Sequence, residues 1–292
     1  ILAQGLKGKG SKTIGVIISD IRQGYFAEII KSIESRANER GFNVMLCDSE
    51  DCAEKEEFYV DIMLRKGVDG LIVAPVDTGQ TFEELRRSKT PCVQVDRKLS
   101  GFPADFVGID NAGAAAEATG RLFEEGYRKV GFLGYHARVH TMAMRREGYR
   151  RVVEEVGAEE LSQEVPHLIH GAMSSTITEW LESHPQVDAL VCGNDDICFE
   201  ALSVLENQGV EVPEDMGIIS FDDTRWFSLL KCPVTAIQQP TVMIGRTAVD
   251  LLLRRLAGAR DAYREELFDT ELLVRGSCSR RAAGRQWLQG RV

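Results

Sequence analysis

Residues 13–41, with the sequence TIGVIISDIRQGYFAEIIKSIESRANERG, combine a buried strand with an amphipathic helix and decide the fold. The segment Ile14–Ile18 is apolar and rich in β-branched residues, which is typical of a strand buried on both faces. After a polar loop, apolar residues recur at spacings of three and four as far as Ala37, which predicts a helix with one apolar face. Gly41 stands where a helix commonly ends. The segment therefore predicts a parallel strand and a helix, joined by a loop at the strand's carboxyl end, where ligands bind in open α/β sheets.

Strand-like and helix-like segments alternate in the same way along nearly the whole chain. The expected strands cover residues 14–18, 43–47, 69–74, 92–95, 106–109, 129–133, 165–169, 188–192, 217–221, 235–238 and 268–274. After the first helix, the expected helices cover residues 53–66, 79–88, 112–125, 142–156, 175–183, 195–208 and 241–256. Strands separated by single helices predict parallel sheets with right-handed crossovers. Because roughly eleven strands are too many for one sheet in this chain, we expect an α/β protein with two lobes of similar plan.

The composition is that of a globular protein with an acidic balance. Of the 292 residues, 43% are hydrophobic and 27% are charged, and the formal net charge is −10. No apolar run reaches membrane-spanning length, and no signal peptide opens the sequence. Seven cysteines without a CxxC pair favour reduced thiols in a cytosol. Because the charge is poorly suited to a phosphate backbone, these residues alone are not expected to bind nucleic acid strongly.

The sequence contains no recognisable catalytic or metal-binding motif. His136 and His140, and likewise His167 and His170, have spacings that metal sites use, but no HExxH motif or cysteine pair accompanies them. A GxSxG nucleophile elbow is absent, and the loop after the first strand lacks the GxGxxG pattern of dinucleotide binding. We therefore expect no enzymatic activity, no metal and no cofactor.

Hydrogen-bonding residues recur just after the expected strands. They are Arg22–Gln23, Asp96–Arg97, Asn194–Asp195, Asp222–Asp223 and Gln238–Gln239, together with Arg145 on the helix after residues 129–133. Taken singly, an Asp or Asn here could cap a helix, and Arg145 could be a solvated surface charge. Because the carboxyl ends of parallel strands share one edge of a sheet, the repeated pattern favours ligand binding.

A series of motifs resembles the effector-binding core of the LacI/GalR family of transcriptional regulators. In chain order they are TIGVIISD and YFAEII, GVDGLIVAP, VDRKL with VGIDN, RREGY, CGNDDICFEAL, GIISFDD and TAIQQP with IGRTAVDLLL. The resemblance covers about residues 1–278. It implies the type I periplasmic-binding-protein-like fold, with two Rossmann-like lobes of parallel strands, three crossover segments and the effector in the cleft between the lobes.

The resemblance also implies where the chain divides. Residues 1–12 resemble the family's hinge helix and linker, in which Leu6 would enter the minor groove of DNA, and the helix-turn-helix headpiece is expected to be missing. Residues 13–110 and 240–258 would form the N-terminal lobe, 111–239 and 259–279 the C-terminal lobe, and 280–292 a tail. The crossovers are expected near Asp110–Asn111, Gln239–Pro240 and Ala259–Asp261.

The effector contacts implied by the resemblance are Tyr25, Phe26, Asp96, Arg97, Arg145, Asn194, Asp222 and Gln238. Guanidinium and carboxylate groups would bind vicinal hydroxyls, and an aromatic face would pack on a sugar ring. Because two acids and two arginines balance, we expect a small neutral sugar or polyol. A phosphate would be repelled by Asp96 and Asp222, and a purine would find only Met173 in place of a second aromatic face. Arg145 is expected in a solvated cleft, so that its removal would spare the fold.

These observations predict the core of a cytoplasmic, homodimeric repressor that responds to a ligand. Effector binding would favour one arrangement of the lobes and so change the spacing of two hinge helices on an operator. The helix at 53–66 and residues near Phe82 would supply the dimer surface. The alternative is a sugar-binding protein of the same fold that serves transport or chemotaxis, which would require export.

Overall fold

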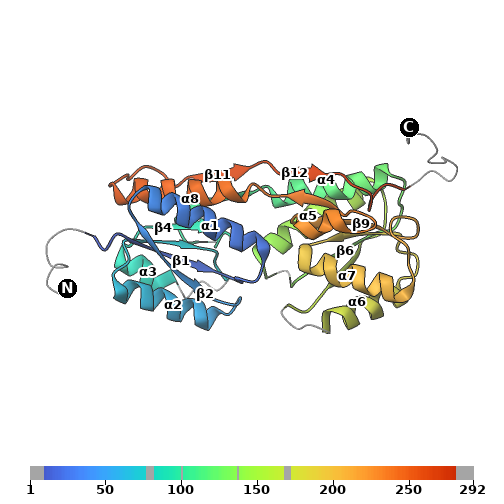
Figure 1. Ribbon diagram of the computed structural model, residues 1–292, viewed down its shortest axis with the longest axis horizontal. Helices are drawn as coiled ribbons and strands as arrows, with labels where there is room; N and C mark the ends of the chain where they lie inside the picture. The colour runs from blue at the N-terminus through green and yellow to red at the C-terminus, as the bar shows by residue number, and fades with distance from the viewer. Residues whose placement is uncertain (1–9, 77–81, 100, 137, 168–171, 281–292) are drawn as a thin grey trace. The chain divides into compact units, whose positions relative to one another are not determined.

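The computed structural model describes residues 10–76, 82–99, 101–136, 138–167 and 172–280 (Figure 1). These residues form two compact units. The first unit comprises residues 10–110, 138–141 and 240–269, and the second comprises the described residues of 111–136, 142–239 and 270–280. The residues expected as a DNA-binding hinge, including Leu6, and those of the C-terminal tail from 281 onward lie outside the described residues.

The first unit contains one six-stranded sheet with the strand order β11-β5-β4-β3-β1-β2. Its elements are β1 (Thr13–Ile18), α1 (Gly24–Glu39), β2 (Asn43–Asp48), α2 (Ala53–Lys66), β3 (Gly70–Val73), α3 (Phe82–Ser88), β4 (Cys92–Val95), β5 (Asp105–Ile109), α8 (Thr241–Leu256) and β11 (Glu265–Phe268). Every neighbouring pair of strands in this sheet is parallel. The carboxyl ends of its strands therefore meet at a single edge.

The second unit repeats this plan with the strand order β12-β10-β9-β8-β6-β7. Its elements are α4 (Asn111–Glu124), β6 (Val130–Gly134), α5 (His140–Glu155), β7 (Leu161–Glu164), α6 (Ala172–Ser183), β8 (Ala189–Cys192), α7 (Asp195–Gln208), β9 (Gly217–Phe221), the 3-10 helix η1 (Arg225–Leu229), β10 (Thr235–Gln238) and β12 (Glu271–Leu273). By position in the two sheets, β4 corresponds to β9 and β5 to β10. The predicted α/β fold with two lobes of similar plan is confirmed.

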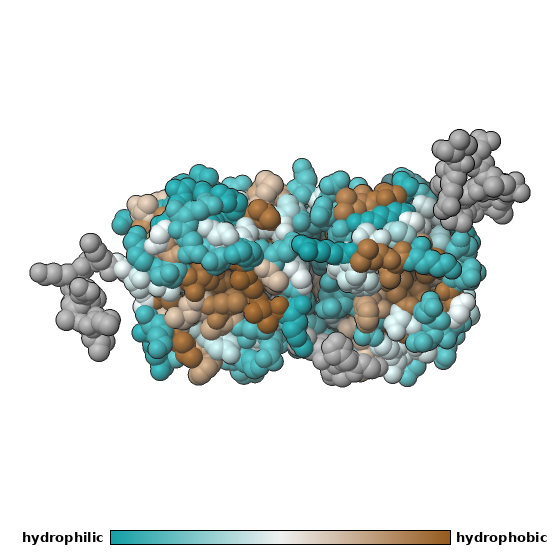
Figure 2. All heavy atoms as spheres, in the orientation of Figure 1, coloured by the Kyte–Doolittle hydropathy of each residue, from teal (hydrophilic) through white to brown (hydrophobic). Residues whose placement is uncertain are grey.

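The strand that opens the fold is fully enclosed in the first unit. The apolar residues of β1 from Ile14 to Ile18, apart from the glycine among them, have no exposed surface. Its neighbour β2 is the edge strand of this sheet. The apolar residues Val44, Met45 and Leu46 of β2 are only half-buried. Figure 2 shows apolar side chains gathered over this part of the first unit.

Helix α8 lies against α1, although about 200 residues separate them in the sequence. A Cβ atom on Gly245 would lie 2.7 Å from the Cβ of Ser32 and 2.8 Å from the carbonyl oxygen of Ile29. The hydroxyl of Ser32 donates to the carbonyl oxygen of Val242 at 2.7 Å. Because glycine permits this close approach, α8 packs as part of the first unit after the chain has returned from the second.

The motif RREGY fixes helix α5 in the second unit. A Cβ atom on Gly148 would lie 2.0 Å from the carbonyl oxygen of Ala112, so α4 and α5 meet at a glycine. The hydroxyl of Tyr149, which has no exposed surface, donates to the carbonyl oxygens of Val130 at 2.9 Å and Leu161 at 3.0 Å, and accepts from the amide of Leu161 at 2.8 Å. These contacts anchor α5, which carries Arg145, to the sheet.

Two strand predictions are wrong. In place of the strand expected at 165–169, the structure has β7 at Leu161–Glu164. This edge strand has the sequence LSQE and little apolar character, so the prediction was drawn to the more apolar residues that follow it. The strand expected at 268–274 is two separate strands in different sheets, β11 and β12. In addition, β12 pairs antiparallel with β10, because no helix separates it from β11 to reverse its direction.

The expected crossover at Ala259–Asp261 is also wrong. Strand β11 pairs with β5 in the first sheet, with Glu265 opposite Phe106 and Phe268 opposite Ile109. The chain therefore remains in the first unit through residue 269. Apart from the short segment 138–141, which groups with the first unit, the chain passes between the units at 110–111, at 239–240 and at 269–270.

Candidate functional site

The predicted binding residues divide between the two units and lie at or near the carboxyl ends of parallel strands. Tyr25, Phe26, Asp96 and Arg97 belong to the first unit, and Arg145, Asn194, Asp222 and Gln238 belong to the second. In the first unit these residues follow the carboxyl ends of β1 and β4. In the second unit they lie at or after the carboxyl ends of β8, β9 and β10, except Arg145, which lies on α5.

Arg97 is a buried cation held between carboxylates. Its guanidinium forms an ion pair with Asp51 through both terminal nitrogens, of which Nη2 lies 3.3 Å from Oδ2, and its Nε lies 3.5 Å from Oδ2 of Asp96. The side chains of Arg97 and Asp96 are 9% and 7% exposed. Burial lowers the pKa of Arg97, but the charge and hydrogen bond of Asp51, together with the charges of Asp96 and Glu56, outweigh this and hold the pKa above its ordinary value. Arg97 is therefore charged and already paired.

The backbone is held in the same unusual conformation at equivalent positions of the two units. Asp96 after β4 has φ of +62°, and Asp222 after β9 has φ of +63°. This left-handed region is disfavoured for residues other than glycine, although Asp and Asn tolerate it best. Such a conformation costs on the order of 1 kcal/mol and is found preferentially at binding sites. The conformation changes the direction of the chain directly after each strand, at the residue that carries the carboxylate.

The aromatic pair at the start of α1 is only partly accessible. The rings of Tyr25 and Phe26 meet edge to face, with 5.1 Å between centroids. Phe26 is 1% exposed and belongs to the core of the first unit, whereas Tyr25 is 9% exposed. Tyr25 is thus the member of the pair with surface left for a ligand, and Phe26 supports it.

Arg145 is enclosed within the second unit. Its Nε donates to Oδ1 of Asn111 at 2.8 Å, and its Nη1 donates to the carbonyl oxygen of Gly193 at 2.5 Å. The guanidinium carbon lies 4.1 Å from the centre of the Phe221 ring. The residue is 3% exposed. The expectation that Arg145 lies in a solvated cleft is therefore wrong, because its charge is satisfied by the start of α4, the end of β8 and the end of β9.

Asn194 caps helix α7 and faces the same edge. Its Oδ1 accepts from the amide of Ile197 at 3.0 Å, and its Nδ2 lies 3.4 Å from the hydroxyl of Tyr135. The residue is 3% exposed. The capping interpretation that the sequence left open therefore holds for Asn194, and the cap fixes its side chain at the carboxyl edge of the sheet.

Asp222 is joined to Gln239. The Nε2 of Gln239 donates to Oδ1 of Asp222 at 2.6 Å, and Gln239 is 6% exposed. Gln238, the residue proposed from the sequence, is exposed and lies opposite Glu271 in the β10–β12 pair. The structure thus brings Gln239, and not Gln238, to the carboxylate of Asp222.

Asp195, the first residue of α7, is half-buried near the same carboxylate. Burial together with the charges of Asp222 and Asp196 raises the pKa of Asp195 to about 8. Burial and these two charges therefore favour the protonated form of Asp195.

The periplasmic binding protein-like domain is the family model that matches this chain, over residues 119–278. The HTH-type transcriptional repressor CytR of Escherichia coli (strain K12) is 30% identical over 285 residues, which cover 94% of this chain and 82% of CytR. The chain belongs to the LacI/GalR family. Its relatives are transcriptional regulators, so it is the ligand-responsive part of a regulator and not a transport protein.

Two solved structures show the likeness of this LacI/GalR core in three dimensions. The transcription regulator CcpA of Lactococcus lactis is 26% identical with a TM-score of 0.83, covering 91% of this chain and 98% of that one. The transcriptional regulator CelR in complex with cellobiose is 25% identical with a TM-score of 0.81, covering 95% of this chain and 88% of that one. Within the described residues, no helix has the length and apolar character needed to cross a membrane.

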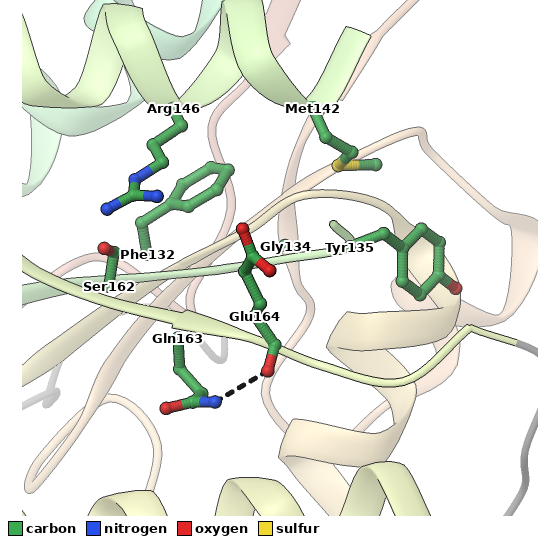
Figure 3. Close-up of a pocket in the computed structure, with 8 residues that line it drawn as sticks. All are labelled: Phe132, Gly134, Tyr135, Met142, Arg146, Ser162, Gln163 and Glu164. Atoms are coloured by element: carbon green, nitrogen blue, oxygen red, sulfur yellow. Dashed lines mark hydrogen bonds between the residues drawn. The ribbon is translucent and has the colours of Figure 1, made fainter. Parts of the chain in front are cut away.

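A small cavity in the second unit of this LacI/GalR core contains none of the predicted site residues. It has a volume of about 80 Å³ and is lined by Phe132, Gly134, Tyr135, Met142, Arg146, Ser162, Gln163 and Glu164. Figure 3 shows Arg146 and Met142 projecting from α5 toward the strands that carry the other residues. Ligand pockets usually measure about 300 Å³ or more, so this cavity suits a few water molecules. Among the described residues, no group of three or more His, Cys, Asp or Glu could hold a metal ion.

The predicted effector contacts do not include Asp51, Asn111, Asp195 or Gln239, although Asp195 and Gln239 belong to the polar pairs expected after strands. Asp51 and Asn111 bind the predicted residues Arg97 and Arg145, which are distant from them in the sequence. Asp195 and Gln239 are the immediate neighbours of the predicted residues Asn194 and Gln238, and both interact with Asp222. Gln238 is the exposed last residue of β10, whereas Gln239 follows the strand and is buried. No sequence signal pointed to Asp51, which follows the edge strand β2.

Proposed function

We propose that this LacI/GalR core binds a small sugar or polyol and thereby controls the affinity of a dimeric regulator for operator DNA. The observation that carries the proposal is the set of carboxylate, amide and guanidinium groups at the carboxyl edges of both sheets. The proposed ligand contacts are Tyr25, Asp96, Arg97, Arg145, Asn194 and Asp222, with Gln239 in place of Gln238. CelR, which holds cellobiose in its solved structure, supports the class of ligand.

The chemistry of these groups suits vicinal hydroxyls. A carboxylate accepts two hydrogen bonds from neighbouring hydroxyls, and a guanidinium donates two in a fixed geometry. Asp96 and Asp222 stand at equivalent strand ends in the same left-handed conformation, so each unit offers one fixed carboxylate. Tyr25 has the apolar ring that sugar-binding sites place against the C–H face of a pyranose or furanose.

Control of DNA binding follows if the ligand has different affinities for two arrangements of the protein. A ligand that binds more tightly to one arrangement shifts the population toward that arrangement. The coupled change in operator affinity cannot exceed the ratio of the ligand affinities of the two states. The curated relative CytR is a repressor, which supports operator DNA as the partner and the cytoplasm as the compartment.

The proposal is tested by ligand screening with a pair of site variants. Thermal-shift measurements with pentoses, hexoses, disaccharides, polyols, sugar phosphates and purines identify the ligand class. We then expect Asp222→Asn to weaken binding of the best sugar by about tenfold or more, the value of a charged hydrogen bond. Asparagine tolerates the φ of +63° at this position, so the backbone is preserved.

Asp223→Asn is the matched control. It removes the same charge one residue further on, where Asp223 forms an ion pair with Arg275 at 2.6 Å. This variant is expected to lose some stability and to keep its affinity for sugar. Stabilisation by purines or sugar phosphates alone, or equal sugar affinities of Asp222→Asn and the wild type, would contradict the proposed function.

We also propose that the core is a homodimer that pairs through its first unit. The half-exposed apolar residues of the edge strand β2 and the 58% exposed Phe58 on α2 supply apolar surface there (Figure 2). Light scattering should give twice the chain mass of 32.4 kDa, and Phe58→Glu should lower it toward a monomer. Leu267→Glu, at a 50% exposed position on β11, is the control and should remain dimeric. A monomeric wild type at micromolar concentration contradicts this proposal.

A further inference from the structure

The surface of the second unit carries an apolar cluster where α7 and η1 meet. It consists of Phe199 on α7 together with Trp226, Leu229 and Leu230, and we call it the η1 patch. Phe199, Leu229 and Leu230 are 55%, 83% and 36% exposed, and Trp226 is half-buried. The rings of Phe199 and Trp226 meet edge to face, with 5.6 Å between their centroids. The helix and η1 therefore share one exposed apolar surface, of the kind that marks protein–protein contacts.

The geometry of η1 explains why these side chains lie together at the surface. A 3-10 helix has three residues per turn, so Trp226 and Leu229 lie on the same face of η1. Phe227 has no exposed surface, and its ring lies 4.5 Å from that of Trp226 between centroids. Its carbonyl oxygen accepts from the amide of Val234 at 3.2 Å. The buried Phe227 thus holds η1 in place while Trp226 and Leu229 remain at the surface.

Charged residues of opposite sign border the η1 patch on its two elements. Asp196 is exposed on α7, one turn before Phe199. Arg225 and Lys231 are exposed at the two ends of the segment that carries the η1 side of the patch. Neither of these two cations forms an ion pair with another described residue. The α7 side of the patch is therefore acidic, and the η1 side is basic.

A second copy of the same patch fits this arrangement better than a partner of a single charge sign. An acidic partner surface would meet Asp196, a basic one would meet Arg225 and Lys231, and like charges across an interface are costly. Two copies related by a two-fold axis present the same surface to each other, so Asp196 of each copy can face Arg225 of the other. The aromatic side chains then meet at the centre of the contact, where interfaces are enriched in Trp and Phe.

We propose that the second units of two copies of this chain associate through the η1 patch in a two-fold contact. This inference rests on the proposed homodimer, and it adds a contact in the second unit to the one assigned to the first. A dimer closes when both contacts share one two-fold axis, so the assembly contains two chains and does not extend further.

The apolar part of the contact is tested by sedimentation velocity, which measures the dissociation constant of the full chain's dimer. We expect Leu229→Glu to raise this constant by about tenfold or more, because a carboxylate would be buried at the centre of the contact. Val156→Glu is the matched control, since Val156 is 51% exposed, follows α5 in the same unit and lies outside the η1 patch. This control should leave the constant unchanged. If circular dichroism shows that Leu229→Glu is not folded, Phe199→Glu provides the same test.

The pairing of charges is tested by mixing two variants. Asp196→Arg and Arg225→Glu should each raise the dissociation constant by about tenfold, because each reversal places like charges together twice in a two-fold dimer. In an equimolar mixture a dimer of one chain of each kind has opposite charges at both places. Native mass spectrometry separates the three dimers by mass, and we expect the mixed dimer to exceed about one half of all dimers, the share given by random pairing.

The outcomes separate this contact from the homodimer on which it rests. A dimeric wild type whose dissociation constant is unchanged in Leu229→Glu, or is raised equally in Val156→Glu, overturns the contact and leaves the contact of the first unit standing. Random mixing of the two charge variants overturns the two-fold pairing of Asp196 with Arg225. A particle of more than two chains overturns the shared axis. A monomeric wild type contradicts the proposed homodimer itself.

Discussion

Replacing Arg145 by alanine is expected to lower the free energy of unfolding by about 3 kcal/mol and to weaken ligand binding by at least about tenfold. The residue is 3% exposed, and its guanidinium binds Asn111 and the carbonyl oxygen of Gly193 and stacks on Phe221. Alanine would leave two buried oxygens without these donors and a cavity beside the aromatic ring. Urea unfolding followed by circular dichroism measures the change in stability, and calorimetry measures the change in affinity.

Arg146→Ala is the control for this substitution. Arg146 is the next residue of α5, its side chain is 42% exposed, and it forms an ion pair with Glu160 at 3.0 Å. Exposed pairs of this kind contribute about 0–1 kcal/mol, so this variant should unfold nearly like the wild type and retain ligand binding. Equal stability of Arg145→Ala and Arg146→Ala would show that Arg145 has no structural role.

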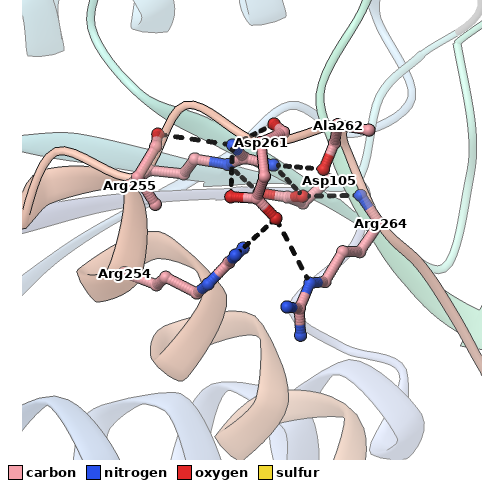
Figure 4. A network of polar contacts seen from close by, with 7 residues as sticks. Asp105, Arg254, Arg255, Asp261, Ala262 and Arg264 are labelled. Atoms are coloured by element: carbon pink, nitrogen blue, oxygen red, sulfur yellow. Dashed lines mark hydrogen bonds and ion pairs between the residues drawn. The ribbon is translucent and has the colours of Figure 1, made fainter.

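Replacing Arg255 by methionine is expected to lower the free energy of unfolding by about 3–5 kcal/mol, the usual cost of removing one partner of a buried ion pair. Its Nε and Nη2 donate to the two carboxylate oxygens of Asp105 at 2.6 Å and 2.7 Å (Figure 4). The side chain of Arg255 is 8% exposed and that of Asp105 is fully buried. Methionine fills much of the same volume but leaves the carboxylate of Asp105 buried beside a single remaining donor that the structure identifies, the amide of Arg264 at 2.7 Å.

The same guanidinium also holds the segment between α8 and β11. It donates to the carbonyl oxygens of Asp261 at 2.8 Å and Ala262 at 3.1 Å. We therefore expect Arg255→Met to expose residues 257–264 to limited proteolysis in addition to lowering the urea midpoint. Arg254→Ala is the control, since Arg254 pairs with the exposed Asp261 and its loss should change little. Protease resistance equal to that of the wild type in Arg255→Met would contradict this anchoring role.

The sequence predicted the elements of the fold wherever local periodicity determines them. The helices at 195–208 and 241–256 and the strands at 217–221 and 235–238 have the predicted bounds, because their apolar patterns begin and end sharply at polar or glycine residues. Strand β7 escaped prediction because an edge strand needs few apolar residues. The last crossover was not predicted, because the ion pair of Arg255 with Asp105 joins residues 150 positions apart and leaves no local pattern in the sequence.

The candidate site was predictable in kind and not in geometry. Alternating strands and helices indicated that Asp96 and Asp222 follow strands, but their left-handed backbone has no sequence signal. The burial of Arg145 depends on partners 34 and 48 positions away, which local patterns cannot reveal. The choice between Gln238 and Gln239 depended on which face of β10 is buried at its final residue.

We predict that Asp96 and Asp222 both bind the sugar, and a single calorimetric experiment tests this most directly. The sugar selected by screening is titrated into the wild type, Asp96→Asn and Asp222→Asn, in which asparagine tolerates the φ of +62° or +63°. We predict one binding site per chain and an affinity lower by about tenfold or more in each variant. Unchanged affinity in either variant, with both proteins folded, would contradict the claim.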